Sequence, residues 1–320
     1  MISQSDRAGD SPAATALTPA PFDVVAEAEG AHGAPVRLRG PAASAAASDP
    51  AAPMVLVSPA MGTPARFYAP LAAELSRTGL MPLLFDQRGQ GERASGAGRF
   101  GYAEMLADLD AAVGAARTAF PDAPLAVLGH SLGGQLALLQ AAQGAHRGTA
   151  APDAVAVVAA GSVWYRSFGA VRGLGVLAGS QSAAMLATVL GRWPGDLFGF
   201  GGRQPARVMR DWARQSRTGR YQLPELAASG GAVDYDALLA RLRLPVLAVG
   251  VAGDRLAPPG AVHHLCGKVP RAALEEWRYT ASKAGGSRLD HFRWVRHGEG
   301  LAAYLADWLG RNGRPLGETA

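Results

Sequence analysis

Short apolar runs alternate with helix-forming segments over most of this 320-residue chain, and this alternation constrains the fold more than any other feature. Continuous apolar runs, typical of strands buried on both faces, cover residues 54–58, 81–86, 125–129, 154–160 and 245–250. Segments with helical spacing cover residues 66–78, 102–120 and 132–143. A further strand at 272–280 and a closing helix at 301–309 complete the pattern, which predicts a mostly parallel sheet with helices on both faces.

Other segments set the domain organisation. Residues 1–20 are rich in Ala, Pro, Ser and Asp, which predicts a disordered leader, and residues 40–53 resemble an exposed loop. The stretches 22–30 and 34–40 alternate like two paired strands of a hairpin. Residues 161–235 contain no strand that fits the sheet and are too long for a bare connection. We expect an α/β core over 21–160 and 236–312, with a helical cap at 161–235 above the carboxyl edge of the sheet.

Residues 127–134 read VLGHSLGG and place Ser131 where a buried strand turns into a helix. Gly129 and Gly133 flank the serine at two residues' distance, which is the G-x-S-x-G spacing of a nucleophile elbow. Because ligands bind beyond the carboxyl ends of parallel strands, this serine lies at the edge where a site is expected. The alternative is a tight turn in which Ser131 only caps the following helix.

A serine hydroxyl needs a general base, and that base needs an orienting carboxylate. In this architecture the chain order is serine, acid, histidine. Asp254 is the only well-placed acid, since it follows the strand at 245–250 in the loop VAGDRLAPP. His291 follows the last strand in GGSRLDHFRW and is the predicted base, with His297 as the alternative. His263 and His264 come too early in the chain, and Asp290 beside His291 is interpreted as a loop carboxylate.

The oxyanion of an acyl-transfer reaction is stabilised by backbone N–H groups. One donor is expected from Leu132, the residue after the serine. The other is expected from the loop SPAMGTPARFY after the first buried strand, from Met61 or Ala60, because Pro59 has no N–H.

These motifs resemble the α/β-hydrolase superfamily over about residues 54–310. The matching stretches are VLVSPAMG, FDQRGQGER, GHSLGG, GDRLAP and DHFRW. Within the superfamily, the chain is similar to the serine-aminopeptidase and monoglyceride-lipase-like branch and to a bacterial set of hydrolases. The resemblance implies that the FDQRGQG loop, with Asp86, is structural. The chain departs from the family's common His-Gly start of the oxyanion loop, since Ser58 and Pro59 stand there.

Composition excludes several classes of function. The net charge of +5 comes from 31 basic residues, of which only Lys268 and Lys283 are lysines, and no basic run points to nucleic acid. The single cysteine, Cys266, permits no internal disulfide and offers no metal-ligand spacing. The N-terminus lacks the pattern of a signal peptide, so we expect a cytoplasmic protein. The uncharged stretch 173–191 contains polar residues and four glycines, which favours a buried or cap helix over stable membrane insertion.

The sequence therefore predicts a serine hydrolase that works through an acyl-enzyme on a small-molecule ester or amide, without metal or organic cofactor. The segment between residues 162 and 226 contains nine arginines and only three acidic residues, whereas an aminopeptidase needs acidic residues to hold the substrate ammonium. This excess favours carboxylic esters over peptides. The alternatives are an aminopeptidase or amidase, an acyltransferase on the same triad, and a non-enzymatic interaction module. The oligomeric state and the substrate are not fixed by the sequence.

The cap also holds large apolar residues that are expected to line an acyl pocket or to pack the cap onto the core. They are Leu174, Val176, Leu177, Met185, Leu186, Val189, Leu190, Phe198 and Phe200.

Overall fold

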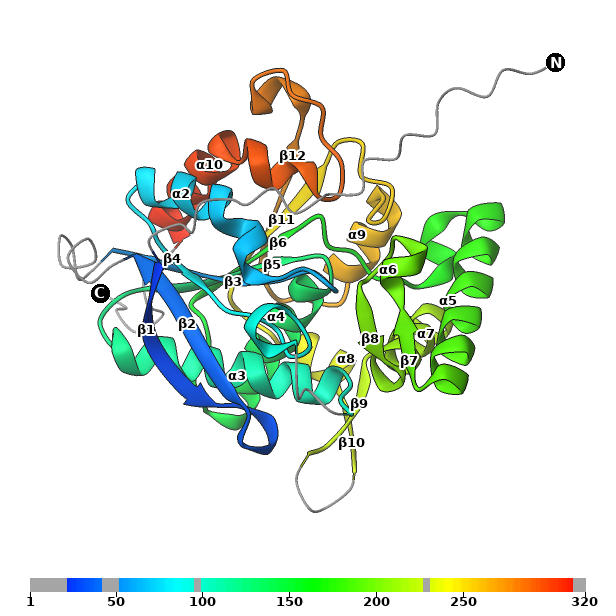
Figure 1. Cartoon of the computed structure of the whole chain (residues 1–320). Helices are drawn as coiled ribbons and strands as arrows, with labels where there is room; N and C mark the ends of the chain where they lie inside the picture. Colours follow the sequence, from blue (N-terminus) through cyan, green and yellow to red (C-terminus); the bar gives the residue numbers. More distant parts are fainter. Residues whose placement is uncertain (1–21, 42–51, 95–98, 227–230, 313–320) are drawn as a thin grey trace.

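A computed structural model describes residues 22–41, 52–94, 99–226 and 231–312 of the chain, and its centre is one eight-stranded sheet (Figure 1). The strand order is β1-β2-β4-β3-β5-β6-β11-β12. The first two strands pair antiparallel as a hairpin, β2 pairs antiparallel with β4, and the other neighbours are parallel. The strands are β1 (Phe22–Glu29), β2 (Pro35–Pro41), β3 (Met54–Ser58), β4 (Met81–Leu84), β5 (Leu125–His130), β6 (Ala154–Val158), β11 (Pro245–Val251) and β12 (Ala273–Tyr279).

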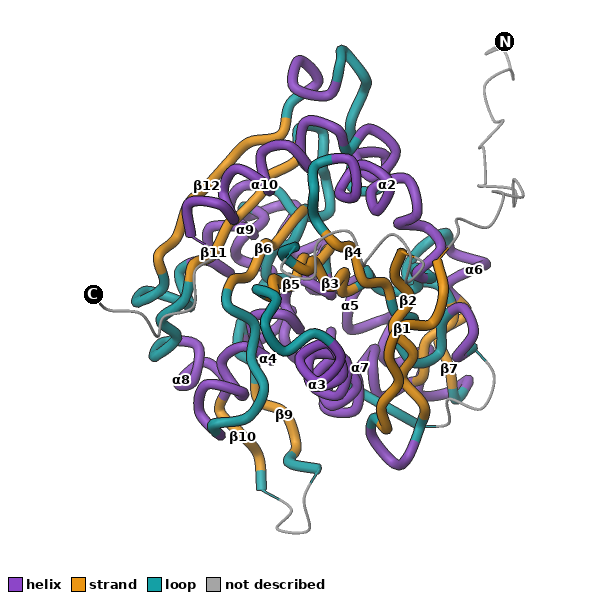
Figure 2. Tube along the Cα trace, turned by 90° about the vertical axis from the view of Figure 1, so that its left-hand side faces the viewer, coloured by secondary structure: helices purple, strands orange, loops and turns teal. Residues whose placement is uncertain are grey.

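Helices cover both faces of this sheet, as the alternation of apolar runs predicts. The helices of the core are α2 (Ala69–Arg77), α3 (Tyr102–Ala119), α4 (Leu132–Arg147), α8 (Tyr235–Leu239), α9 (Pro259–Cys266) and α10 (Glu299–Asn312). In β3, Met54 and Leu56 share a core with α3 and α4, whereas Val55 and Val57 pack toward α2 and α10. Figure 2 shows α2 and α10 on one side of the strands and α3 and α4 on the other. The α/β-hydrolase architecture is therefore confirmed.

The helix predicted over residues 66–78 begins later than expected. The segment Ala65–Tyr68 is a short 3-10 helix, and α2 starts only at Ala69. An α-helix from Arg66 would need an N–H at Pro70 to bond the Arg66 carbonyl, and proline has none. The tighter bond from the Ala69 N–H to the Arg66 carbonyl replaces it.

Residues 161–235, here called the insertion, contribute no strand to the central sheet within their described part. They form the helices α5 (Ala170–Leu190), α6 (Gly195–Phe198) and α7 (Ala206–Thr218) and the strands β7 (Arg192–Pro194), β8 (Arg203–Pro205), β9 (Gln222–Pro224) and β10 (Ala232–Asp234). The two small hairpins, β7 with β8 and β9 with β10, are features that the sequence did not predict. The predicted leader at 1–20 and most of the loop at 40–53 lie outside the described residues.

Two polar contacts attach the insertion to the core at the start of α3. The Asp211 carboxylate of α7 accepts a hydrogen bond from the Tyr102 backbone N–H at 2.9 Å, and Arg207 pairs with Glu104 at 2.7 Å. Burial raises the pKa of the Asp211 carboxyl above its usual range. The N-terminus of α3 and the Asp211 carboxylate thus hold α7 against the core.

A buried ion cluster joins the N-terminal hairpin to the loop after β4. Asp108 of α3 is fully buried and bonds Arg88 through both oxygens at 2.6 and 2.8 Å. It also pairs with Arg93 at 2.8 Å and accepts the Ala31 backbone N–H at 3.0 Å. One carboxylate therefore holds three segments that are far apart in the sequence.

Asp108→Ala is expected to lower the free energy of unfolding by about 3–5 kcal/mol, because it leaves two buried guanidinium groups without their counter-ion. Asp122→Ala, at an exposed loop position, serves as the control and is expected to stay within about 0.5 kcal/mol of the wild type. Urea unfolding of the three proteins measures both values. Equal stability of Asp108→Ala and wild type would contradict the structural role of this cluster.

Candidate active site

Ser131 lies at the turn between β5 and α4 in a backbone conformation that L-residues rarely adopt, with φ 54° and ψ −117°. The close approach of neighbouring backbone explains the glycines around it. A Cβ on Gly129 would lie 2.3 Å from the Gly134 Cα, and one on Gly133 would lie 2.0 Å from the Ser58 carbonyl oxygen. Only glycine fits at these positions, so the packing of β3, β5 and α4 imposes the strained turn at Ser131.

The helix-cap interpretation of Ser131 is not supported. Its side chain makes no capping hydrogen bond to α4, and its φ is positive instead of extended. The side chain is half-exposed at the carboxyl edge of the sheet. The Ser131 hydroxyl therefore does not serve as the cap of α4.

Asp254 and His291 meet at the same edge of the sheet. The His291 Nδ1 lies 2.9 Å from the Asp254 Oδ2, and both side chains are nearly inaccessible to solvent. The other carboxylate oxygen, Oδ1, accepts the backbone N–H groups of Leu256 and Ala257 at 2.7 and 3.0 Å. Asp254 thus orders its own loop with one oxygen and faces the imidazole with the other. Because a carboxylate only accepts, Nδ1 carries a proton, and in the neutral ring Nε2 is then the nitrogen with the lone pair.

The two loops that hold this pair are packed directly on each other. Gly253 has φ +79°, and a Cβ there would lie 2.6 Å from the Leu289 carbonyl oxygen. No hydrogen bond in the described residues joins the Ser131 hydroxyl to His291. The structure therefore brings together the acid and the predicted base, with the serine at the same sheet edge but not bonded to them.

The other histidines and the neighbouring acid do not compete for these positions. His297 is exposed, and its backbone carbonyl accepts the Tyr279 hydroxyl. His263 is exposed in α9, and the His264 ring packs at a tilt of 32° against the Trp164 ring, with the ring centroids 4.4 Å apart. Asp290 accepts two backbone N–H groups of its own loop, as expected for a loop carboxylate.

Hydrogen bonds in the loop after β3, predicted as the oxyanion loop, show which of its two candidate donors, Ala60 or Met61, has a free N–H. The Ala60 N–H donates to the Tyr68 hydroxyl at 2.8 Å and is therefore occupied. The N–H groups of Met61 and Leu132 make no hydrogen bond in the described part of the chain, and Leu132 is the first residue of α4. The positive end of that helix dipole adds to an electrostatic field suited to an anion. Ser58, at the position of the family's usual histidine, is buried and its hydroxyl has no partner in the structure.

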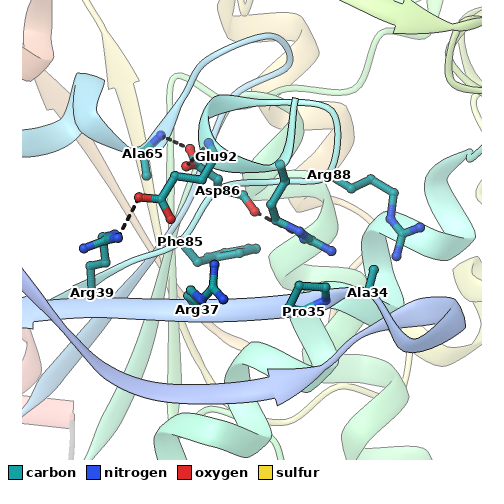
Figure 3. A pocket seen from close by; sticks show the side chains of 10 residues that line it. Ala34, Pro35, Arg37, Arg39, Ala65, Phe85, Asp86, Arg88 and Glu92 are labelled. Atoms are coloured by element: carbon teal, nitrogen blue, oxygen red, sulfur yellow. Dashed lines mark hydrogen bonds and ion pairs between the residues drawn. The ribbon is translucent and has the colours of Figure 1, made fainter. Parts of the chain in front are cut away.

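Asp86 holds the far end of the oxyanion loop, as expected for a structural residue. Its Oδ1 accepts the Ala65 N–H at 2.7 Å and its Oδ2 accepts the Glu92 N–H at 2.9 Å. Figure 3 shows Asp86 above Phe85 in a cavity of about 180 Å³ between β2 and the loop after β4. The arginines of this cavity are already paired with carboxylates, as Arg39 is with Glu92. The cavity thus belongs to the framework that supports the oxyanion loop.

Sequence reasoning missed two residues that support the site, Tyr68 and His130. The Tyr68 hydroxyl accepts from Ala60 and donates to the His130 Nδ1 at 2.8 Å, and the His130 Nε2 donates to the His291 carbonyl at 2.9 Å. The Trp294 indole N–H donates to the same carbonyl at 2.9 Å. This chain of bonds ties the oxyanion loop, the residue before the serine, and the base loop together. The histidine in GHSLGG was the available signal, but its partners are 62 and 161 residues away in the sequence.

The tautomer of His130 follows from these partners, because a carbonyl can only accept and Nε2 must therefore carry the proton. Complete burial lowers the pKa of His130 well below its usual value of 6.5, and the neighbouring His291 lowers it further. The ring is thus neutral and acts as a fixed bridge.

The insertion contacts the oxyanion loop through backbone. A Cβ on Gly62 would lie 2.3 Å from the Gly201 carbonyl oxygen, and a Cβ on Gly201 would lie 3.0 Å from the Met61 sulfur. Of the apolar residues expected to line a pocket or pack onto the core, five are instead exposed: Leu174, Met185, Val189, Leu190 and Phe198. That expectation was wrong for these five, because α5 packs on α7 through small residues.

The comparison with known families settles the family. A profile described as serine aminopeptidase, S33, matches residues 49–279 of the chain, which includes the elbow and the Asp254 loop. The chain belongs to this family of α/β hydrolases. No curated protein sequence is similar enough to count as a match.

Solved structures show the same fold. This hydrolase is similar to a thermophilic esterase from Thermogutta terrifontis, with 14% identity, a TM-score of 0.59 and coverage of 91% of this chain and 100% of that chain. It is also similar to an esterase from Rhodococcus sp. ECU1013, with 18% identity, a TM-score of 0.55 and coverage of 92% of this chain and 100% of that chain. A third similar structure is an enol-lactonase from Burkholderia xenovorans, with 17% identity, a TM-score of 0.53 and coverage of 91% of this chain and 100% of that chain. At such identities the likeness establishes the fold alone.

The neutral state of His130 predicts a dependence of stability on pH. In the unfolded chain His130 binds a proton near pH 6.5, whereas in the native state its ring stays neutral at this pH. The free energy of unfolding therefore falls as the pH drops below that value. This one group contributes a slope of up to about 1.4 kcal/mol per pH unit. Urea unfolding from about pH 8 to about pH 5 is expected to show a shallower loss for His130→Gln than for wild type. Identical pH dependence in the two proteins would contradict a neutral, buried His130.

Proposed function

We propose that this hydrolase cleaves carboxylic esters through an acyl-enzyme formed on Ser131, with the insertion acting as a cap over the site. The bond between the His291 Nδ1 and Asp254, which leaves Nε2 free at the edge where Ser131 is strained, is the observation that supports this proposal most. The esterases and the lactonase among the structural neighbours are consistent with it.

In the proposed mechanism, the Ser131 hydroxyl attacks the ester carbonyl while the His291 Nε2 takes its proton. Asp254 stabilises the imidazolium through the Nδ1 bond. The Met61 and Leu132 N–H groups stabilise the oxyanion, and His291 returns the proton to the departing alcohol. A water molecule activated by the same base then releases the acid. A bond between Ser131 and His291 would form on substrate binding, because catalytic hydrogen bonds in unliganded sites are often loose.

The preference for esters over N-terminal peptides has a structural argument. A substrate ammonium needs a free carboxylate, and the insertion has three acids between residues 162 and 226. Asp196 pairs with Arg203 at 2.8 Å, Asp211 bonds the Tyr102 N–H, and Glu225 lies 3.9 Å from Arg147. Each acid is already engaged. Aminopeptidase activity remains the second candidate because the family profile carries that description.

Turnover of p-nitrophenyl esters tests both the base and the bond cleaved. His291→Ala is expected to reduce kcat on the order of 10²–10⁴-fold, because the serine loses its general base. His297→Ala is the matched control on the same loop and is expected to retain wild-type turnover, since His297 is exposed and makes no contact with Asp254.

Loss of turnover in His297→Ala with full activity in His291→Ala would contradict the assignment of the base. Aminoacyl-anilides measured in parallel separate the two candidate functions. Anilide cleavage without ester turnover would replace the esterase proposal with the aminopeptidase.

A further inference from the structure

Helix α5 turns several large apolar side chains toward solvent, whereas its buried residues are all small. The inner face consists of Gly173, Ser180, Ala183, Ala184 and Ala187. The outer face carries Val171, Leu174, Met185 and Val189, with exposed fractions of 88%, 62%, 68% and 78%. These positions follow helical spacing and form one stripe along the helix. A helix of a soluble protein ordinarily shows the opposite arrangement.

The inner contacts fix this orientation. The buried Ser180 hydroxyl lies 2.9 Å from the Ser216 hydroxyl of α7, and the Gln181 amide donates to the Ala213 carbonyl at 2.8 Å. Small residues let the two helices approach closely, so α5 cannot rotate its stripe inward without breaking these bonds. Figure 1 shows α5 at the outer edge of the molecule, beyond α7.

The apolar stripe, here called the α5 stripe, is followed along the chain by further exposed apolar side chains in α6. Leu190 is 55% exposed at the end of α5, and Leu197 and Phe198 of α6 are 81% and 57% exposed. Seven of the twelve exposed large apolar side chains in the described residues therefore come from residues 171–198. Exposed apolar side chains gathered in one region of the chain in this way mark an interaction site.

The charges beside the stripe indicate what covers it. Arg166 and Arg172 flank its N-terminal end, and Arg192 and Arg203 flank its C-terminal end, where Arg203 is paired with Asp196. Asp196 is the single acid between residues 161 and 203. An apolar stripe with cationic ends is complementary to a surface that has apolar chains below anionic headgroups. Two copies placed face to face would instead bring arginines of like charge together.

We propose that the α5 stripe docks on the surface of an anionic lipid bilayer, with α5 lying in the plane of the interface. Among the described helices α5 alone has the length and apolar character to cross a bilayer, with a mean hydropathy of 1.4. Its bonds to α7 through Ser180 and Gln181 favour lying on the surface over crossing it. The loop after α6 packs against the loop after β3 at Gly62, so the insertion that carries the stripe is in direct contact with the site. The proposal concerns binding and does not depend on the esterase assignment.

Sedimentation with vesicles of equal parts phosphatidylcholine and phosphatidylglycerol tests this docking on the full-length protein. The wild type is expected to sediment with these vesicles and less with pure phosphatidylcholine. The variant Leu174→Gln/Met185→Gln/Val189→Gln is expected to lower the partition coefficient by more than about tenfold, because its apolar contact is lost. Val24→Gln/Leu274→Gln is the matched control, since these side chains are exposed to 40% and 38% on edge strands of the sheet.

Circular dichroism and the thermal unfolding midpoint check that each variant is folded. If the triple variant does not fold, a separate Arg172→Gln/Arg192→Gln variant tests the proposal instead. That variant is expected to weaken binding to the anionic vesicles only. Wild-type protein that stays in the supernatant with both vesicles would overturn the proposal, as would equal binding of wild type and triple variant. A dimer that the triple variant dissociates, without vesicle binding, would assign the stripe to a second copy of the chain.

Discussion

The strand-to-helix turn at Ser131 is the constraint on which the rest of the site depends. Its backbone is held at φ 54° because Gly129 and Gly133 bring β5, α4 and the end of β3 into contact distances that no other residue allows. The same packing leaves the Leu132 N–H at the start of α4 without a hydrogen bond among the described residues and sets the loop after β3 against the helix. The strained conformation of Ser131 persists because the packing of β3, β5 and α4 around it leaves the turn no other conformation.

Around this turn, a single buried histidine connects the parts that must stay in register. His130 bonds Tyr68 on one side and the His291 carbonyl on the other, and Tyr68 in turn bonds the Ala60 N–H. Because the ring is neutral, the bridge adds no charge next to the serine. The loop that carries His291 and the loop after β3 are therefore positioned by hydrogen bonds that originate in the residue before Ser131.

The parallel sheet was predictable because buried strands are continuous apolar runs that alternate with helical segments, whereas the order of the strands was not predicted. Asp254 and His291 were predictable because the carboxyl ends of parallel strands meet at one edge. Tyr68 was not, since its partner depends on tertiary packing across 62 residues. The orientation of α5 was also inaccessible, because its apolar content predicts burial whereas its small residues, such as Ala187, in fact form the contact with α7. The start of α2 could have been predicted from Pro70.

The central claim is that the strained Ser131 is an activated nucleophile. Labelling with a fluorophosphonate probe, followed by mass spectrometry of the modified peptide, tests it most directly. The account predicts a covalent adduct on Ser131 in the wild type, no adduct in Ser131→Ala, and normal labelling of Ser282→Ala, which alters an exposed serine. A folded wild-type protein that does not react, or an adduct that persists in Ser131→Ala, would contradict it.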